Sequence, residues 1–286
     1  MLGNHLLGLY EKALPPEMDW RRRLEAARDL GFDFLEISID ETDERLARLD
    51  TPGTELHRAI RASGIYPHSI CLSAHRRFPF GSADPAVRAR AREIMERAVL
   101  FAREFGVRVI QLAGYDVYYE PSTDESLRLF QEGLQYACRL AEQYQVMLAM
   151  EIMDTELMSS ITRYHRWKAR LPSPWLMVYP DLGNLSAWGN DTLGELRSAA
   201  GEIVAVHVKD TLAVTPEHAG TFKGVPFGSG CVDFSACFRQ LESQGYHGPY
   251  MVEMWHKPGQ DWERNISSAL AYISAQFAAA QDGEAL

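Results

Sequence analysis

The stretch MLAME at residues 147–151 is a short apolar run that ends in a carboxylate. Three later stretches have the same form, namely LMVYP (176–180) before Asp181, VAV (204–206) before His207 and PYMV (249–252) before Glu253. Such endings are unusual, because burying a charged or imidazole side chain without a partner costs several kcal/mol. Four of them in series, all of residue types that bind hard cations, indicate one polar site at one end of a parallel sheet.

Short apolar runs alternate with amphipathic segments along the whole chain. Eight strands are expected near residues 6–10, 34–38, 67–73, 107–112, 147–150, 176–180, 204–206 and 249–252. Eight helices are expected near 20–30, 55–63, 85–105, 125–143, 161–169, 193–200, 234–244 and 262–280. Repeated strand–helix units of this number predict an α/β fold with a single (β/α)8 barrel over residues 1–286. A doubly wound sheet is the alternative, since alternation alone does not prove closure.

The composition and charge of the chain argue against several classes of function. The 286-residue chain has a net charge of −10, which argues against nucleic acid as the main partner, because no basic field would attract a phosphate backbone. The four cysteines form no CxxC pair, so reduced thiols are expected. No stretch approaches the roughly 18 to 20 apolar residues of a membrane span, and the N-terminus does not resemble a signal peptide. We therefore expect a cytoplasmic protein that binds neither membranes nor nucleic acid.

The strand ends of a barrel share one mouth, which would bring Glu151, Asp181, His207 and Glu253 together. Three carboxylates and one imidazole suit a divalent ion such as Mn²⁺, Mg²⁺, Co²⁺ or Zn²⁺. An ion that chelates a substrate carbonyl and its neighbouring hydroxyl would acidify the C–H between them and stabilise an enediolate. Glu151 and Glu253 lie across the barrel from each other, as two bases would need to. Taken singly, each of the four residues is explained as well by a strand cap or an ion pair.

The chain also carries longer segments with a family pattern, namely LGLYEKALP (7–15), FLEISIDETDERLARLD (34–50), CLSAHRRFPFGS (71–82), VIQLAGYDVYY (109–119), LAMEIMD (148–154), YPDLGNLSAW (179–188), IVAVHVKDT (203–211), FKGVPFGSG (222–230) and GPYMVEMW (248–255). Over about Leu6 to Trp255 the chain resembles the L-ribulose-5-phosphate 3-epimerase family, also called the L-xylulose-5-phosphate 3-epimerase family, among the xylose-isomerase-like barrels. The resemblance implies interconversion of L-xylulose 5-phosphate and L-ribulose 5-phosphate in pentose and L-ascorbate catabolism. It also implies a divalent metal on the four strand-end residues, with the two glutamates as the acid/base pair.

Five further residues are candidates for substrate contact, and they are His75, Arg76, Asn184, Lys209 and Lys223. The first two follow a strand on the mouth side, and Lys209 shares the strand side of His207 if the strand continues. The glycine-rich segments 220–224 and 228–230 could offer backbone N–H groups to an anion. A solvated turn, a helix cap or plain loop closure explains each of these features as well. Glu36 is open between a functional role and an internal ion pair.

Three other functions stay open at this point. Another metal-dependent ketose epimerase or an aldose–ketose isomerase would use the same scaffold, and a non-catalytic sugar-phosphate-binding protein would keep the barrel without turnover. A metal-dependent repair endonuclease is disfavoured, because it should need more histidine ligands and a basic face. A homodimer is compatible with the aromatic residues expected near the outer helices.

Overall fold

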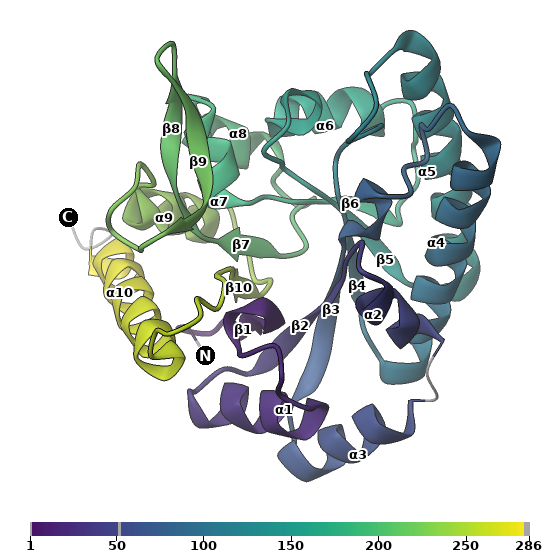
Figure 1. The fold of residues 1–286 in the computed structure, drawn as a ribbon. Coiled ribbons are helices and arrows are strands. Elements are labelled where there is room, and N and C mark those ends of the chain that lie inside the picture. Colours follow the sequence, from purple (N-terminus) through teal and green to yellow (C-terminus); the bar gives the residue numbers. More distant parts are fainter. Residues whose placement is uncertain (1, 51–52, 283–286) are drawn as a thin grey trace.

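The computed structural model describes residues 2–50 and 53–282 and contains eight parallel strands surrounded by helices (Figure 1). The strands are β1 (Leu7–Tyr10), β2 (Phe34–Ile39), β3 (Tyr66–Leu72), β4 (Val109–Leu112), β5 (Met147–Glu151), β6 (Leu176–Tyr179), β7 (Val206–Val208) and β10 (Tyr250–Val252). They pair in the order β6-β5-β4-β3-β2-β1-β10-β7. Each bound lies within two residues of the sequence-based expectation.

Two isolated bridges join the end strands of this sheet, β6 and β7. Val178 pairs with Ile203 and Asp181 pairs with His207, both in parallel register. The amide of His207 also donates to the carbonyl of Pro180 at 2.9 Å. The predicted (β/α)8 barrel is therefore confirmed and the doubly wound alternative is not, because an open sheet would leave its end strands apart. Closure also places Asp181 directly beside His207.

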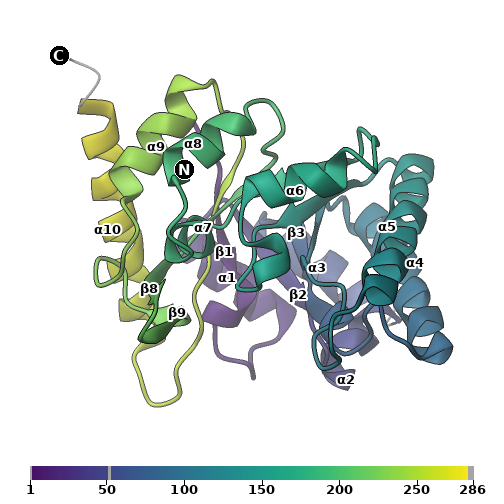
Figure 2. The same ribbon diagram turned by 90° about the horizontal axis from the view of Figure 1, so that it is seen from above.

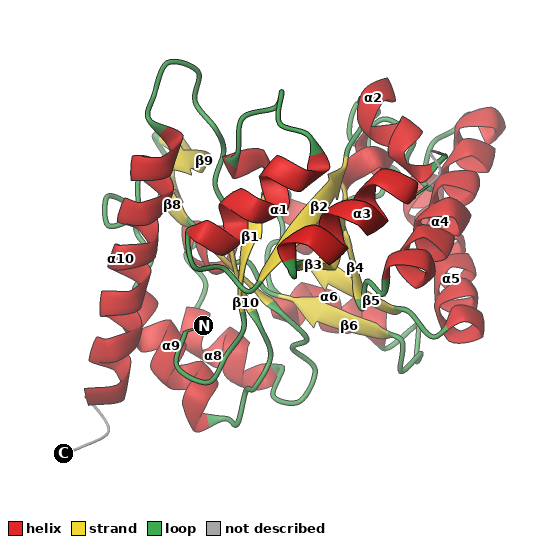
Figure 3. Cartoon of the chain, turned by 90° about the horizontal axis from the view of Figure 1, so that it is seen from below, coloured by secondary structure: helices red, strands yellow, loops and turns green. Residues whose placement is uncertain are grey.

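The outer layer consists of helices that follow the strands (Figures 2 and 3). The longer ones are α1 (Trp20–Asp29), α3 (Thr54–Ser63), α4 (Pro85–Phe105), α5 (Asp124–Tyr144), α6 (Ile161–Lys168), α8 (Thr192–Ser198), α9 (Phe234–Ser243) and α10 (Trp262–Asp282). Helix α4 shows how the sequence sets such bounds: the Asp84 side chain caps its first turn, and Gly106 ends it at a φ of 69° that side-chain-bearing residues rarely adopt. Within residues 2–50 and 53–282, no helix is both long enough and apolar enough to cross a membrane.

Shorter elements lie in the loops that follow the strands. They are η1 (Glu11–Ala13), α2 (Asp43–Leu46), η2 (Ala47–Leu49), η3 (Ser73–Arg76), η4 (Glu156–Met158) and α7 (Leu182–Ala187). Between β7 and α9 the chain forms an antiparallel hairpin of β8 (Asp210–Thr215) and β9 (His218–Val225), whose tip extends away from the barrel (Figure 1). Neither α7 nor this hairpin is predicted by the local sequence pattern, which indicates a loop over 220–224.

The strands alternate between the two layers of the core. In β2, Leu35, Ile37 and Ile39 pack in the large cluster under the helices, whereas Phe34 belongs to a separate cluster with Met251 of β10, across the neighbouring strand β1. Because side chains two residues apart share a face, Glu36 also points into the barrel. The same two-residue step leads from interior apolar residues, such as Ala149, Tyr179 and Met251, to the polar residues at the strand ends.

Candidate active site

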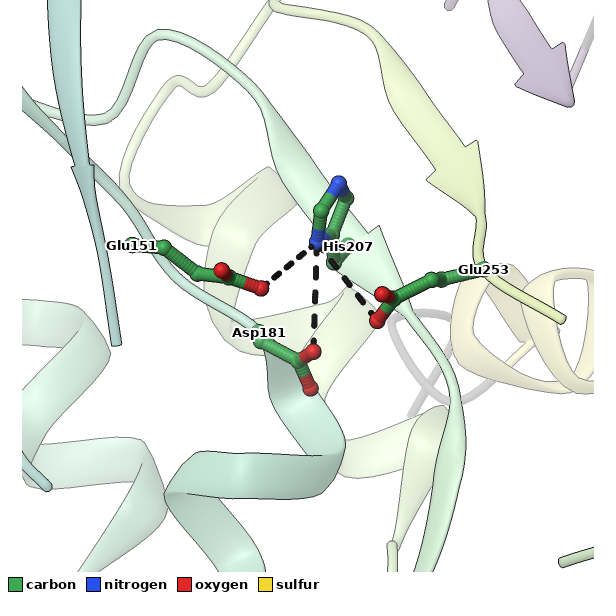
Figure 4. Close-up of side chains that lie close together, drawn as sticks. All are labelled: Glu151, Asp181, His207 and Glu253. Atoms are coloured by element: carbon green, nitrogen blue, oxygen red, sulfur yellow. Dashed lines mark hydrogen bonds and ion pairs between the residues drawn. The ribbon is translucent and has the colours of Figure 1, made fainter. Parts of the chain in front are cut away.

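Four polar side chains converge at the carboxyl end of the barrel. Glu151 ends β5, Asp181 is the N-cap of α7, His207 lies within β7 and Glu253 directly follows β10. None is more than 7% exposed, and one ligand atom from each lies within 4.8 Å of the others. Figure 4 shows Glu151 and Glu253 reaching in from opposite sides, with His207 and Asp181 between them. These are the four residues that the sequence analysis selected, and the fold brings all of them together.

The imidazole of His207 is the hub of the four. Its Nδ1 lies 3.1 Å from Glu151 Oε1, 3.7 Å from Glu253 Oε2 and 3.9 Å from Asp181 Oδ2. Atoms that ligate one small divalent ion lie roughly 3 to 4 Å apart, since each is about 2 Å from the ion. The spacing of these atoms therefore fits a shared cation.

Two interior residues support this arrangement: Gln111, which the sequence did not suggest, and Glu36, which the sequence left open between a functional role and an internal ion pair. Gln111 of β4 donates through its side-chain amide to Glu151 Oε2. Glu36 of β2 lies 2.9 Å from His207 Nε2. The signal that could have identified Gln111, and that favours function for Glu36, is a polar side chain within a short apolar strand, one step along the inward-facing series.

Lys209 brings a cation to the edge of the cluster. Its Nζ lies 2.7 Å from Asp181 Oδ2 and 2.9 Å from Glu253 Oε2, and the residue is 4% exposed. It lies on the same side as His207, as the two-residue spacing predicts. The two carboxylates raise the pKa of Lys209 well above its usual value even though burial acts to lower it. The side chain is thus a permanent ammonium within the site.

Burial and mutual repulsion set the charges of the acids. Burial raises the pKa of Asp181 to about 8, with Lys209 opposing the shift. Burial also raises the pKa of Glu151, against the attraction of His207. Glu253 behaves differently: burial favours its neutral form, but Lys209 and His207 outweigh burial and lower its pKa to about 2. The carboxylates outnumber the cations that face them, so an additional positive charge would stabilise the cluster.

The unused lone pairs point to the same conclusion. Asp181 Oδ2 and Glu253 Oε2 have no hydrogen-bond partner of good geometry among the described residues, and the Lys209 ammonium, 2.7 and 2.9 Å away, is their counter-charge. Buried oxygens without a donor are costly unless another group satisfies them. Three carboxylates and one ring nitrogen form a hard donor set without thiolate. The four residues could therefore hold a divalent metal ion.

Comparison with known proteins agrees with this geometry. Residues 24–276 match the family model described as xylose isomerase-like TIM barrel. The chain is 51% identical over 277 residues to a putative L-ribulose-5-phosphate 3-epimerase, SgbU, of Escherichia coli strain K12, covering 96% of this chain and 97% of the relative. The L-ribulose-5-phosphate 3-epimerase UlaE of an E. coli strain is also 51% identical, over 96% of this chain and 95% of that relative. The chain belongs to this epimerase family.

Solved structures with lower identity share the fold of this epimerase. A D-allulose 3-epimerase from Methylomonas sp. superimposes with a TM-score of 0.77 at 19% identity, covering 95% of this chain and 98% of that chain. A structure of L-ribulose 3-epimerase gives a TM-score of 0.75 at 21% identity, covering 98% and 96%. At these identities the comparison shows the fold alone. These superpositions agree with the barrel predicted from the sequence.

His75 and Asn184, two of the residues expected to touch substrate in this epimerase, make hydrogen bonds within the protein, although Asn184 Oδ1 has no partner among the described residues. His75 is buried in η3, where its Nε2 lies 3.2 Å from the carbonyl of Ala91 and its ring packs on Phe80. The 3-10 turn directs this ring towards α4, which corrects the expectation that it faces the mouth. The side-chain amide of Asn184 donates to the carbonyl of Ile152 at 2.9 Å, and its backbone N–H donates to Asp181 Oδ1 at 2.9 Å. It ties the loop after β5 to α7 and so holds Asp181 in place.

The cations of Arg76 and Lys223 each lie over an aromatic ring in a loop that follows a strand. The Arg76 guanidinium stacks over the Tyr118 ring at 4.6 Å, and its buried Nε has no hydrogen-bond partner in the described part of the chain. Lys223 lies on β9 and is exposed, and its Nζ stands 5.7 Å from the Trp255 ring. Lys209 faces the same ring at 5.6 Å. The hairpin therefore brings a second lysine close to the cluster, although by a strand rather than the expected loop.

In the second glycine-rich segment, residues 228–230, backbone amides already donate hydrogen bonds to a carboxylate of the epimerase itself, that of Asp210. Asp210 Oδ2 accepts from the amides of Gly228 and Gly230, each at 2.9 Å, and Oδ1 accepts from the amide of Thr211 at 2.9 Å. The backbone donors predicted to bind a substrate anion are thus occupied by a buried carboxylate. This corrects the sequence-based interpretation of 228–230, while 220–224 lies in strand β9.

A cavity of about 210 Å³ lies beside the cluster, between the base of the hairpin and α10. Lys209 and Glu253 form part of its wall, together with Trp255, Lys257 and Asn265. Lys257 closes one side by donating to the carbonyl of Gly224 at 3.1 Å. A small polar molecule in this cavity of the epimerase would contact Glu253 directly.

Proposed function

We propose that this chain interconverts L-ribulose 5-phosphate and L-xylulose 5-phosphate by inverting carbon 3. The observation that carries the proposal is the pair of buried glutamates, Glu151 and Glu253, on opposite sides of one cluster that could hold a cation (Figure 4). Inversion needs a base on each face of the carbon. The 51% identity to L-ribulose-5-phosphate 3-epimerases over nearly the whole chain supports the choice of substrate.

Glu151, Asp181, His207 and Glu253 would hold the divalent ion in this proposal. When bound, the ion supplies Lewis-acid polarisation of the substrate carbonyl and stabilises the negative charge of an enediolate. Mn²⁺, Mg²⁺, Co²⁺ and Zn²⁺ all suit a set of three carboxylates and one imidazole.

The cytoplasmic location of the protein and its assembly as a homodimer, both expected from the sequence, remain predictions.

The proton moves between the two glutamates and the substrate. One glutamate removes the C3 proton, and the other delivers a proton to the opposite face, so the substrate gains and loses one proton in total. Gln111 donates to Glu151 and fixes the direction of its second oxygen. Lys209 keeps Glu253 ionised, since it lowers the pKa of that carboxyl against the effect of burial. Glu253 is therefore ionised at neutral pH, as a proton acceptor must be.

Three cations are proposed to contact the oxygens of the substrate, namely Arg76, Lys209 and Lys223. Arg76 has an unpartnered Nε, and the two lysines flank Trp255 at the cavity. Arg76→Met should raise the KM for the phosphorylated ketose by about tenfold, because a hydrogen bond to a charged group contributes roughly 1.5 to 3 kcal/mol. The neighbouring Arg77 is a matched control, since it is exposed and paired with Asp43. If Arg77→Met raises the KM as much as Arg76→Met does, the assignment of Arg76 is wrong.

Product analysis tests the proposed reaction. The metal-loaded protein is incubated with L-ribulose 5-phosphate or with unphosphorylated L-ribulose, and products are identified by NMR. We expect L-xylulose 5-phosphate, with kcat/KM at least about tenfold higher for the phosphorylated ketose. An aldose product would indicate an isomerase, and turnover restricted to the unphosphorylated sugar would indicate another ketose epimerase. Binding of the phosphate ester without any conversion would indicate a binding protein.

A further inference from the structure

Glu36 is a fully buried acid that the proposed proton transfer does not use. It lies in the middle of β2, points into the barrel and is 0% exposed. A carboxylate in such a position is costly unless its oxygens are satisfied. The hydrogen-bond partners of Glu36 therefore indicate its role.

Both oxygens of Glu36 are engaged, and in different ways. Oε2 accepts hydrogen bonds from the Ser69 hydroxyl at 2.6 Å and from the Tyr179 hydroxyl at 3.1 Å. Oε1 lies 2.9 Å from Nε2 of His207. The two hydroxyls come from β3 and β6, so the carboxylate is held from two directions and Oε1 is left for the imidazole. Tyr179 also packs its ring on that of His207, with centroids 4.5 Å apart.

The contact with Glu36 bears on which ring nitrogen of His207 carries the hydrogen. Glu36 Oε1 is an acceptor, so Nε2 of His207 carries the hydrogen in this pair. With the hydrogen held on Nε2, Nδ1 is the nitrogen that can offer its lone pair to a cation, and it is Nδ1 that faces Glu151, Asp181 and Glu253. A histidine ligand held by a second carboxylate in this way is oriented and made more basic before a metal arrives.

A second glutamate–histidine pair, in which the histidine is buried and the glutamate is partly exposed, serves another purpose. His5 contacts Glu242 at 2.6 Å, and its other ring nitrogen lies 2.8 Å from the carbonyl of Gly248. Both nitrogens of His5 are thus used within the protein. His207 is different, because its second nitrogen meets only acids.

We propose that Glu36 is a positioning residue that selects the tautomer and ring orientation of His207, and thereby sets the affinity of the four-residue cluster for a divalent cation. The proposal rests on the metal-binding part of the proposed function. It does not depend on which sugar is the substrate. It adds to the site a residue from β2, a strand that carries none of the four proposed metal ligands.

Metal affinity, measured without substrate, tests this role. We expect Glu36→Gln to weaken Mn²⁺ binding by about 10- to 100-fold in calorimetric titration of the metal-free protein. Glu242→Gln is the matched control and should leave the dissociation constant unchanged. A folded Glu36→Gln protein that binds Mn²⁺ with the wild-type constant would overturn the proposal. If Glu36→Gln does not fold, Ser69→Ala and Tyr179→Phe each remove one donor to Glu36. Several-fold weaker binding in both would support the role, and unchanged binding in both would overturn it.

The tautomer itself is visible by ¹⁵N NMR of histidine-labelled protein loaded with Zn²⁺. We expect the His207 signals of a ring protonated at Nε2 and ligated through Nδ1. Protonation at Nδ1 with ligation through Nε2 would contradict the proposal, whatever the activity. Absence of turnover on L-ribulose 5-phosphate, with both metal results as expected, would overturn the proposed reaction and leave the role of Glu36 standing.

Discussion

Two groups of buried acids lie at the same end of this barrel, and they are built in opposite ways. Around Glu11, which directly follows β1, stand the guanidinium groups of Arg23, Arg45 and Arg48. Nearby, Lys12 pairs with Asp40 at 2.6 Å. In this arginine cluster the cations outnumber the acids.

The ligand cluster, consisting of Glu151, Asp181, His207 and Glu253, has the reverse balance. Lys209 is the one ammonium in contact with it among the described residues, and the imidazole is shared among several acids. A buried acid surrounded by arginines is neutralised within the fold, whereas acids that face each other require a cation from outside. Counting the charges around a strand-end carboxylate therefore distinguishes a structural acid from a candidate metal ligand.

The largest expected effect comes from removing a base from the ligand cluster. Glu151→Gln or Glu253→Gln should lower kcat by at least about 10³-fold, because each change removes a proton carrier together with a charged ligand. The fold should persist, as judged by circular dichroism at 25 °C. Either variant retaining more than a tenth of wild-type kcat would remove that glutamate from the proton transfer.

The same substitution in the arginine cluster should act on stability instead. Glu11→Gln leaves three guanidiniums around a neutral group, which should cost about 3 to 5 kcal/mol of unfolding free energy in urea titration. Its effect on Mn²⁺ affinity should be negligible, since none of the described contacts links Glu11 to the ligand cluster. A Glu11→Gln protein of wild-type stability with weakened metal binding would reverse the contrast between the two groups.

A third buried group, His75, is expected to behave like the arginine cluster. Burial lowers its pKa from the ordinary 6.5 to about 4. The unfolded chain therefore takes up a proton below about pH 6.5 that the folded chain refuses until about pH 4, so this residue's contribution to stability falls as pH falls between those values. The difference in unfolding free energy between wild type and His75→Gln should change by about 3 kcal/mol from pH 7 to pH 4. A pH-independent difference would show that His75 is not held neutral.

The smallest expected effect concerns the ammonium of the ligand cluster. Lys209→Met removes a positive charge beside Asp181 and Glu253, so Mn²⁺ should bind roughly tenfold more tightly while kcat falls. Lys223→Met is the control, because Lys223 faces the same Trp255 ring at a similar distance without an ion pair to the cluster in the described structure. Weaker Mn²⁺ binding in Lys209→Met would mean that the ammonium supports the ligands rather than competing with the metal.

Local patterns in the sequence were sufficient for the barrel and its four strand-end residues. Apolar runs, helix caps and the two-residue step of a strand are all local, and Glu151 and Glu253 follow from them once the strands are arranged in a ring. Lys209 was found in the same way, by its spacing from His207.

Features that depend on distant partners were not accessible in this way. The β8–β9 hairpin is held by pairing between two half-exposed strands, which leaves a weak apolar pattern. The Asp210 carboxylate accepts hydrogen bonds from the amides of Gly228 and Gly230, which lie 18 and 20 residues further along the chain. His75 and Arg76 are neighbours in the sequence, which gives no sign of the 3-10 turn that contains them. That turn directs the two side chains differently, so that the His75 ring contacts the carbonyl of Ala91 whereas Arg76 Nε has no hydrogen-bond partner in the described part of the chain.

The most direct test of the account is proton NMR of L-ribulose 5-phosphate in D₂O with the metal-loaded enzyme. We predict that deuterium enters carbon 3 as L-xylulose 5-phosphate accumulates, that a chelator stops both processes, and that Mn²⁺ restores them. Epimer formation at an undiminished rate in the fully metal-free protein, or epimer formed without deuterium at carbon 3, would contradict the account.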